Sequence, residues 1–204
     1  VFRGTDPDDP REWLGNLDVR LSQWRGGGRV HAGFLASFEE DELSARLVEE
    51  FRRPDAAWPL WIAGHSLGGA LAILAARKFV DEEAAPFKYL RVVTFGAPRV
   101  GDADFVRGYR PRTWRILSGR DPVPRLPPSA FGYRHVVSEV RDRDGVVVRS
   151  VRGKKDDDES SRGGPGSGLA ESLLEPFSDH APIVYADALW NASRGAGGDP
   201  AAGV

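Results

Sequence analysis

The pentapeptide at 64–68, Gly-His-Ser-Leu-Gly, constrains this chain more than any other part of its sequence. An apolar run at 58–63 precedes it and a helix-forming run at 70–79 follows it, which predicts a strand, a sharp turn and a helix. A serine in such a turn stands clear of the sheet. The residues two places before and after it need to be almost free of side chain, because larger ones would collide across the turn. Both are glycine here, and Gly69 lets the helix approach the strand, so the pattern predicts that Ser66 is a nucleophile.

Composition is that of an ordinary soluble globular protein. The 204 residues suffice for one domain with a sizeable core, and 41% hydrophobic with 28% charged residues is typical of that class. A formal net charge of −2 gives no reason to expect a nucleic-acid partner, and no apolar run has the length of a transmembrane helix. Cysteine is absent, so neither disulfides nor a thiolate-bound metal can support the fold. Without cysteines or a signal peptide in this sequence the compartment stays open, with an intracellular one slightly favoured.

The first residues indicate a domain that is truncated at its N-terminus. The sequence contains no methionine, and residues 1–5 have the pattern of a buried strand that runs into a glycine turn. We therefore expect the first strands of the sheet to be missing.

Along the rest of the chain, strands alternate with helices, which favours an α/β fold with a mostly parallel central sheet. Apolar residues at helical spacing predict one helical face from Phe34 to Phe51. The other expected elements are a strand and turn at 29–33, strands at 90–95 and 113–117, a helix at 102–109, a hairpin of 135–140 with 146–151, and a helix at 182–190.

Residues 1–191 are expected to form the domain, and 192–204 a flexible tail. Within the domain, the stretch at 153–168 is charged, rich in glycine and too poor in apolar residues to order itself, which predicts a disordered insertion. Near the N-terminus, five apolar residues follow a helix-start signature at Asp9. They lie on one helical stripe, or on a helix continued by an extended piece: Trp13, Leu14, Leu17, Leu21 and Trp24.

A nucleophilic serine needs a base, usually an imidazole. Of the four histidines, His180 lies in a loop before the last helix, where a chain order of nucleophile, acid and histidine would put it. His31 and His135 are expected to be structural, and His65 to point away from the serine and serve in packing or in a supporting contact.

Asp121 is the favoured acid, because it follows a predicted strand, although an aspartate before a proline is also common in plain turns. Asp102 and Asp104 have the pattern of helix caps, and Asp179 is too close to His180 in sequence. The backbone N–H of Leu67 is expected to stabilise an oxyanion. Thr5 is a second candidate donor, with an ordinary turn residue as the alternative.

Taken together, these segments resemble the class 3 (fungal-type) lipases from residue 2 to about 190. The matching pieces are Phe2–Thr5, Val30–Phe34, Gly64–Ala72, Thr94–Gly101, Asp121–Pro128, Phe131–Tyr133, Asp179–His180 and Tyr185. The resemblance implies an α/β-hydrolase fold that hydrolyses acylglycerols or related esters without a cofactor or metal. It implies a triad of Ser66, Asp121 and His180, and an oxyanion hole of Thr5 and Leu67.

The resemblance also gives a meaning to the N-terminal stripe. The segment at about 6–25 looks like the lid of the fungal members, with Trp13, Leu14 and Leu17 as lid and substrate-binding residues. Such a lid exposes apolar surface at a lipid–water interface, which implies an ester lipid substrate and peripheral contact with a membrane surface. The alternative is an amphipathic helix that is permanently packed on the core.

A triacylglycerol lipase is the activity that this resemblance favours. Three alternatives stay open: a phospholipase A1 or galactolipase, a feruloyl-type esterase on the same fold, and a lipase-like interaction module that performs no hydrolysis. The two tryptophans and three leucines of the stripe favour a lipase over a feruloyl-type esterase.

Overall fold

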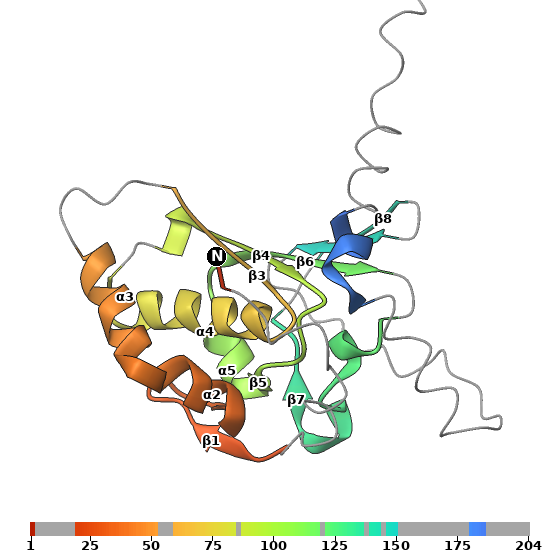
Figure 1. Cartoon of the computed structure of the whole chain (residues 1–204). Coiled ribbons are helices and arrows are strands. Elements are labelled where there is room, and N and C mark those ends of the chain that lie inside the picture. The colour runs from red at the N-terminus through yellow and green to blue at the C-terminus, as the bar shows by residue number, and fades with distance from the viewer. Residues whose placement is uncertain are drawn as a thin grey trace, which may run out of the picture.

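Figure 1 shows the computed structural model of the chain. The structure describes residues 1–2, 19–52, 59–84, 87–118, 121–136, 139–143, 146–150 and 180–186. Several predictions from the sequence lie outside these described residues: Thr5 as an oxyanion donor, the lid residues Trp13, Leu14 and Leu17, the insertion at 153–168 and the tail at 192–204.

The central sheet has five strands in the order β3-β4-β6-β9-β8. Three of them are parallel neighbours: β3 (Leu60–His65), β4 (Leu90–Phe95) and β6 (Arg112–Ser118). The hairpin of β8 (Glu139–Arg143) and β9 (Val146–Ser150) adds two antiparallel strands beside β6. At the other edge, the N–H of Phe2 donates to the carbonyl of Ala63 at 2.8 Å, beside β3. The α/β fold with a mostly parallel central sheet is therefore confirmed.

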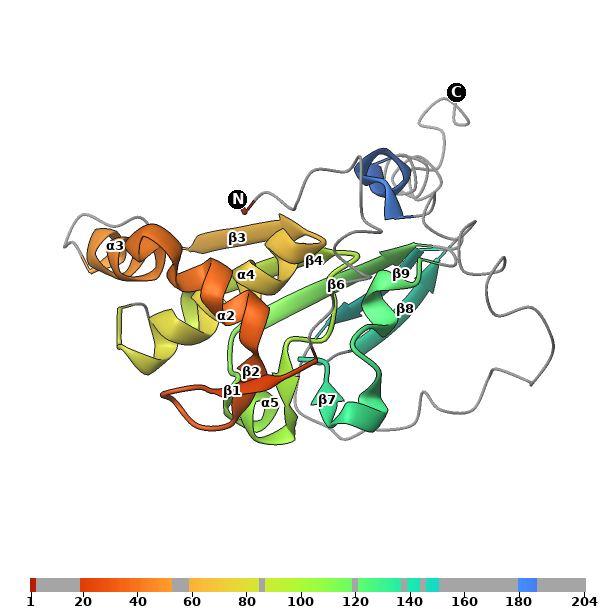
Figure 2. The same cartoon turned by 60° about the horizontal axis from the view of Figure 1, so that its bottom comes forward.

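Helices cover both faces of this sheet (Figures 1 and 2). On one face lies α4 (Leu67–Asp81), whose alanines at 70, 72, 75 and 76 are fully buried and let the neighbouring elements approach closely. Outside α4 pack α2 (Ala32–Glu39) and α3 (Leu43–Phe51). On the opposite face, a short helix at 182–186 buries Tyr185 against β4 and β6. Within the described residues, no helix combines the length and apolar character that a bilayer crossing requires.

A second, antiparallel sheet was not expected from the sequence. Its order is β1-β2-β5-β7, and its strands are β1 (Leu21–Gln23), β2 (Arg29–His31), β5 (Gly101–Asp102) and β7 (Tyr133–Arg134). The short helix α5 (Ala103–Gly108) follows β5, and Asp102 caps it by accepting from the N–H of Phe105 at 3.0 Å, as the sequence predicted. Short 3₁₀ turns complete the described elements: η1 (Glu40–Glu42), η2 (Phe87–Tyr89), η3 (Val123–Arg125) and η4 (Ser129–Phe131).

Three local predictions need correction. The single helical face from Phe34 to Phe51 is two helices separated by η1, where Glu42 adopts a left-handed φ of 58°. Four consecutive acidic residues at 39–42 repel one another within a helix, which favours the break. The turn expected at 29–33 is the start of α2, because His31 Nδ1 accepts from the first N–H groups of that helix. The hairpin strand expected from His135 begins at Glu139.

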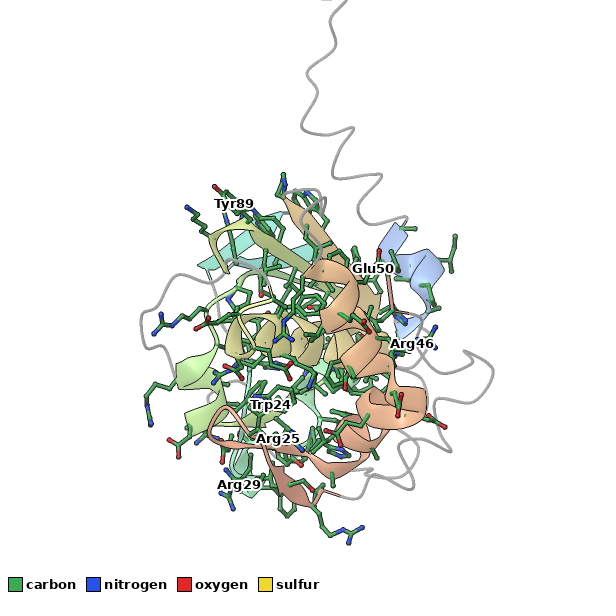
Figure 3. The ribbon with its side chains drawn as sticks, turned by 90° about the vertical axis from the view of Figure 1, so that its left-hand side faces the viewer. Trp24, Arg25, Arg29, Arg46, Glu50 and Tyr89 are labelled. Atoms are coloured by element: carbon green, nitrogen blue, oxygen red, sulfur yellow. The ribbon has the colours of Figure 1, made fainter. Side chains whose placement is uncertain are left out.

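The N-terminal apolar stripe ends in a strand and not in a helix. Leu21 lies in β1, and Trp24 is buried in the core, where its Nε1–H donates to Asp81 at 2.7 Å. Figure 3 shows Trp24 with Arg25 and Arg29, which are exposed. Of the two readings of the stripe, one continuous helix is therefore wrong at its C-terminal end.

Trp24 belongs to a polar cluster, centred on the buried Arg77, that ties the β1–β2 loop to α4. Arg77, only 4% exposed, donates to the carboxylate of Asp81 at 2.8 Å and to the carbonyl of Gly26 at 2.6 Å. A side chain on Gly26 would collide with Asp81, since its Cβ would lie 2.0 Å from a carboxylate oxygen. The loop therefore depends on a paired, buried arginine.

We predict that Asp81→Ala lowers the free energy of unfolding by about 3 kcal/mol, because it leaves the buried guanidinium of Arg77 without its counter-charge. Asp81→Asn is the matched control: it keeps an oxygen acceptor but also removes the counter-charge, so at least about 2 kcal/mol of the loss should remain. Urea unfolding followed by circular dichroism measures both. A loss below about 1 kcal/mol in Asp81→Asn would show that the hydrogen bonds matter and the charge does not, which would contradict the ion-pair account.

Candidate active site

Ser66 occupies a strained turn between β3 and α4. Its φ of 55° and ψ of −127° lie outside the regions that side-chain-bearing residues favour. Hydrogen bonds hold the turn on both sides: the N–H of Ser66 donates to the carbonyl of Phe95 at 2.9 Å, and its own carbonyl accepts from Gly69 at 2.9 Å. A Cβ at Gly64 would lie 2.1 Å from the carbonyl oxygen of Gly68, so the turn closes only with glycine there. The strand, sharp turn and helix expected around Ser66 are all present.

The N-terminus of α4 points its first backbone N–H groups toward the region of Ser66. The N–H groups at the start of a helix lack acceptors within it and carry a partial positive charge. The N–H of Leu67 makes no hydrogen bond within the described part of the chain. It is therefore available to bind a negatively charged oxygen, which is what an oxyanion donor has to do.

Asp121 and His180 are joined by a buried hydrogen bond. His180 Nδ1 lies 2.8 Å from Asp121 Oδ2, and both residues are 5% exposed. A carboxylate can only accept here, so Nδ1 carries the proton and the lone pair of a neutral His180 is on Nε2. That is the tautomer that a general base requires.

The carboxylate of Asp121 is fixed by two further donors. Its Oδ1 accepts from the N–H of Val123 at 2.9 Å, which starts η3, and its Oδ2 accepts from the hydroxyl of Tyr185 at 2.5 Å. The carboxylate of Asp121 therefore has two roles: it accepts from the backbone of its own turn, as the sequence pattern indicated, and it contacts His180.

Gly96, directly after β4, leaves room for this pair. Its φ is +57°, and a Cβ there would lie 2.8 Å from Asp121 Oδ2, 2.9 Å from the Tyr185 hydroxyl and 3.1 Å from His180 Cε1. Sequence reasoning assigned no role to Gly96 or Tyr185. Both lie in segments that carry the family resemblance, but a glycine directly after a predicted strand by itself indicates no more than a turn.

The parallel strands explain why these groups meet. Ser66, Gly96 and Asp121 follow the carboxyl ends of β3, β4 and, after a short loop, β6, and such ends share one edge of a sheet. His180 comes to the same edge from the C-terminal part of the chain. The structure thus brings Asp121 and His180 into contact near Ser66, and within the described residues no hydrogen bond joins the Ser66 hydroxyl to His180.

The remaining histidines have other contacts. His65 Nε2 lies 2.8 Å from the backbone carbonyl of His180, and its ring packs 4.6 Å from the His180 ring. His31 caps α2 and stacks on Phe34, and His135 Nε2 lies 2.6 Å from the carbonyl of Pro124. Among the described residues, no three histidine, aspartate or glutamate side chains gather in a way that could hold a metal ion.

We predict that Gly96→Ala disturbs the Asp121–His180 hydrogen bond, because the new methyl group has no room beside the carboxylate. Gly132→Ala is the matched control, since Gly132 also has a positive φ, of 86°, but nothing lies within 4 Å of the added Cβ. Both variants should lose about 1 kcal/mol of stability from backbone strain. Only Gly96→Ala should lose or shift the downfield proton resonance of His180 Nδ1. If that resonance is unchanged in Gly96→Ala, the absence of a side chain at Gly96 is not required for the Asp121–His180 hydrogen bond.

Comparisons with known proteins identify the family of this chain. The family model described as Lipase (class 3) matches residues 1–131. A secreted mono- and diacylglycerol lipase of Fusarium solani is 36% identical over 135 residues, which cover 63% of this chain and 39% of the relative. A lipase of Rhizomucor miehei is 37% identical over 151 residues, covering 68% of this chain and 40% of the relative.

Among solved structures, a triacylglycerol lipase whose catalytic centre is described as a serine protease triad aligns with a TM-score of 0.58 and 33% identity. The alignment covers 69% of this chain and 56% of that structure. The chain therefore spans about two fifths of the curated relatives and just over half of the solved structure. On the family match and these relatives, the chain belongs to the class 3 lipase family of the α/β-hydrolase superfamily.

Proposed function

We propose that this protein is a serine carboxylic-ester hydrolase of the triacylglycerol lipase type, with Ser66, Asp121 and His180 as its triad. The observation that carries the proposal is the buried 2.8 Å contact of Asp121 with His180 Nδ1, at the sheet edge where the strained Ser66 turn lies. It leaves the lone pair of His180 on Nε2, which supports a role as the base that the Ser66 hydroxyl needs.

In the proposed reaction, His180 Nε2 takes the proton of Ser66 as the serine oxygen attacks the ester carbonyl carbon. Backbone N–H groups of Leu67 and Thr5 donate to the oxygen that becomes negative. The bond to the alcohol then breaks, and His180 returns its proton to the departing alkoxide. Water attacks the acyl-enzyme in the same way, with His180 again as base, and releases a carboxylic acid and free Ser66.

Acylglycerols are the proposed substrates. Support comes from the relatives, which include a protein named as a mono- and diacylglycerol lipase and one described as a triacylglycerol lipase. A phospholipase A1 or galactolipase would use the same three residues, and so would a feruloyl-type esterase. Rates on matched acylglycerol, phospholipid, galactolipid and feruloyl ester substrates separate these four activities, and the highest kcat/KM should be on the acylglycerol.

We also propose that Trp13, Leu14 and Leu17 form a lid that acts at a lipid–water interface. Three large apolar side chains close together favour burial in lipid, at about 25 cal/mol for each Å² removed from water. The buried position of Trp24 fits such a lid only if its moving part ends before that residue.

We predict that Ser66→Ala lowers ester hydrolysis by at least about 1000-fold, because no other group in the proposed site supplies the nucleophile. p-Nitrophenyl butyrate below its solubility limit is a suitable substrate, since a lid is not needed for it. A wild-type-like melting temperature is the control for folding. If Ser66→Ala keeps most of the activity, Ser66 is not the nucleophile.

For the lid, we predict that the rate on tributyrin rises sharply once its concentration passes the solubility limit and droplets form. The triple variant Trp13→Ala, Leu14→Ala, Leu17→Ala should lose most of that rise and keep its rate on dissolved p-nitrophenyl butyrate within about 3-fold. Smooth saturation of the wild type below the limit would instead indicate an esterase in which the stripe is ordinary packing.

A further inference from the structure

His65 makes contacts with His180 that the proposed reaction does not use. It is the last residue of β3, immediately before Ser66, and it is half-buried. Its Nε2 lies 2.8 Å from the backbone carbonyl oxygen of His180, and the two imidazole rings are 4.6 Å apart with a tilt of 34°. Its ring also meets that of Tyr185 edge-on at 5.6 Å. His65 therefore contacts both residues of the C-terminal segment that hydrogen-bond to the carboxylate of Asp121.

We propose that His65 is a positioning residue for His180, which acts by holding the backbone and the ring of His180 in the orientation that keeps Nδ1 on Asp121. The inference rests on the proposed hydrolase function. It adds a residue that touches neither Asp121 nor the substrate, but works through His180.

The hydrogen bond determines which nitrogen of His65 carries its proton. A carbonyl oxygen can only accept, so Nε2 of His65 donates and its Nδ1 holds a lone pair while the ring is neutral. Without this bond, His180 would keep only its contact to Asp121 as a polar anchor among the described residues. With the Asp121 contact alone, the ring of His180 could still rotate about that hydrogen bond. The second hydrogen bond, from His65 to the backbone carbonyl of His180, fixes the backbone that carries the ring.

The charge of His65 also affects His180. The titratable groups that face His65 are His180 and Tyr185 from the C-terminal segment and Asp121 from the loop after β6, while its partner on β4 is Phe95. During the proposed reaction His180 becomes positively charged, which a neutral neighbouring ring tolerates and a charged one opposes. Burial, followed by the nearby charge of His180, lowers the pKa of His65 below its ordinary 6.5. His65 is therefore neutral when His180 has to accept a proton.

Two substitutions separate the hydrogen bond from mere bulk. His65→Gln can still donate from Nε2 and cannot take up a proton, whereas His65→Leu fills the space without a donor. Trp61→Leu is the matched control, because Trp61 lies on the same face of β3 and is 59% exposed. With p-nitrophenyl butyrate at about pH 8, we expect His65→Leu to lower kcat about 10- to 100-fold with an unchanged KM. His65→Gln and Trp61→Leu should stay within about 3-fold of the wild type.

The pH profile adds a readout that a purely structural role would not change. In the wild type, protonation of His65, which occurs only below pH 6.5, should add to the loss of activity on the acid side. In His65→Gln this contribution is absent, so the fall should be less steep. The stability of the fold should depend on pH in the same direction. Below pH 6.5, His65 takes up a proton more readily in the unfolded than in the folded protein, so the free energy of unfolding decreases as the pH falls. This decrease should be smaller in His65→Gln.

The inference and the proposed function can fail separately. If the wild type hydrolyses no ester, the proposed function fails, and the downfield proton of His180 Nδ1 still tests the inference by NMR. That resonance should be present in the wild type and in His65→Gln, and weakened by faster exchange in His65→Leu. A resonance unchanged in His65→Leu, or equal losses of kcat in the two His65 variants, would overturn the role of His65.

Discussion

The hydrogen bond between Asp121 and His180 is the contact on which the other parts of the site depend. It joins residues 59 positions apart, and the groups around it support it by hydrogen bonds or by leaving space. Val123 and Tyr185 donate two further hydrogen bonds to the carboxylate of Asp121. Gly96 leaves room for the carboxylate, because any side chain at that position would collide with it. A buried carboxylate with three hydrogen-bond donors loses little by leaving water, so the pair stays ordered although it is buried.

Ser66, in contrast, is positioned by its backbone, which adopts a strained conformation. The strain persists because the sheet and α4 hold the turn from both ends: Ser66 bonds to Phe95 on β4, and Gly69 bonds back to Ser66. The position of the hydroxyl is thus determined by rigid elements. That of His180 is determined by side chains, and His65 links the two, since it belongs to β3 and contacts His180.

Much of the scaffold could be predicted from the sequence, because its signals are local. Apolar runs such as residues 58–63 are typical of strands, and the glycines around Ser66 indicate a closed turn. The four-stranded sheet could not be predicted in this way, since its strands have two or three residues and two of its three pairings join distant segments, as Asp102 with Tyr133. Trp24 has helical spacing and yet follows a strand, because tertiary packing overrides so short a pattern. The requirement for Gly96 arises from side chains at 121, 180 and 185, which are distant in sequence.

The central claim is that Ser66 is an activated nucleophile, and covalent labelling with a fluorophosphonate tests it most directly. Mass spectrometry of the digested protein should locate one label on the peptide that contains Ser66, and Asp121→Asn should slow the labelling strongly, since His180 would lose the partner that fixes its tautomer. A folded protein whose Ser66 stays unlabelled would contradict the account, and would indicate a lipase-like module that binds without hydrolysis.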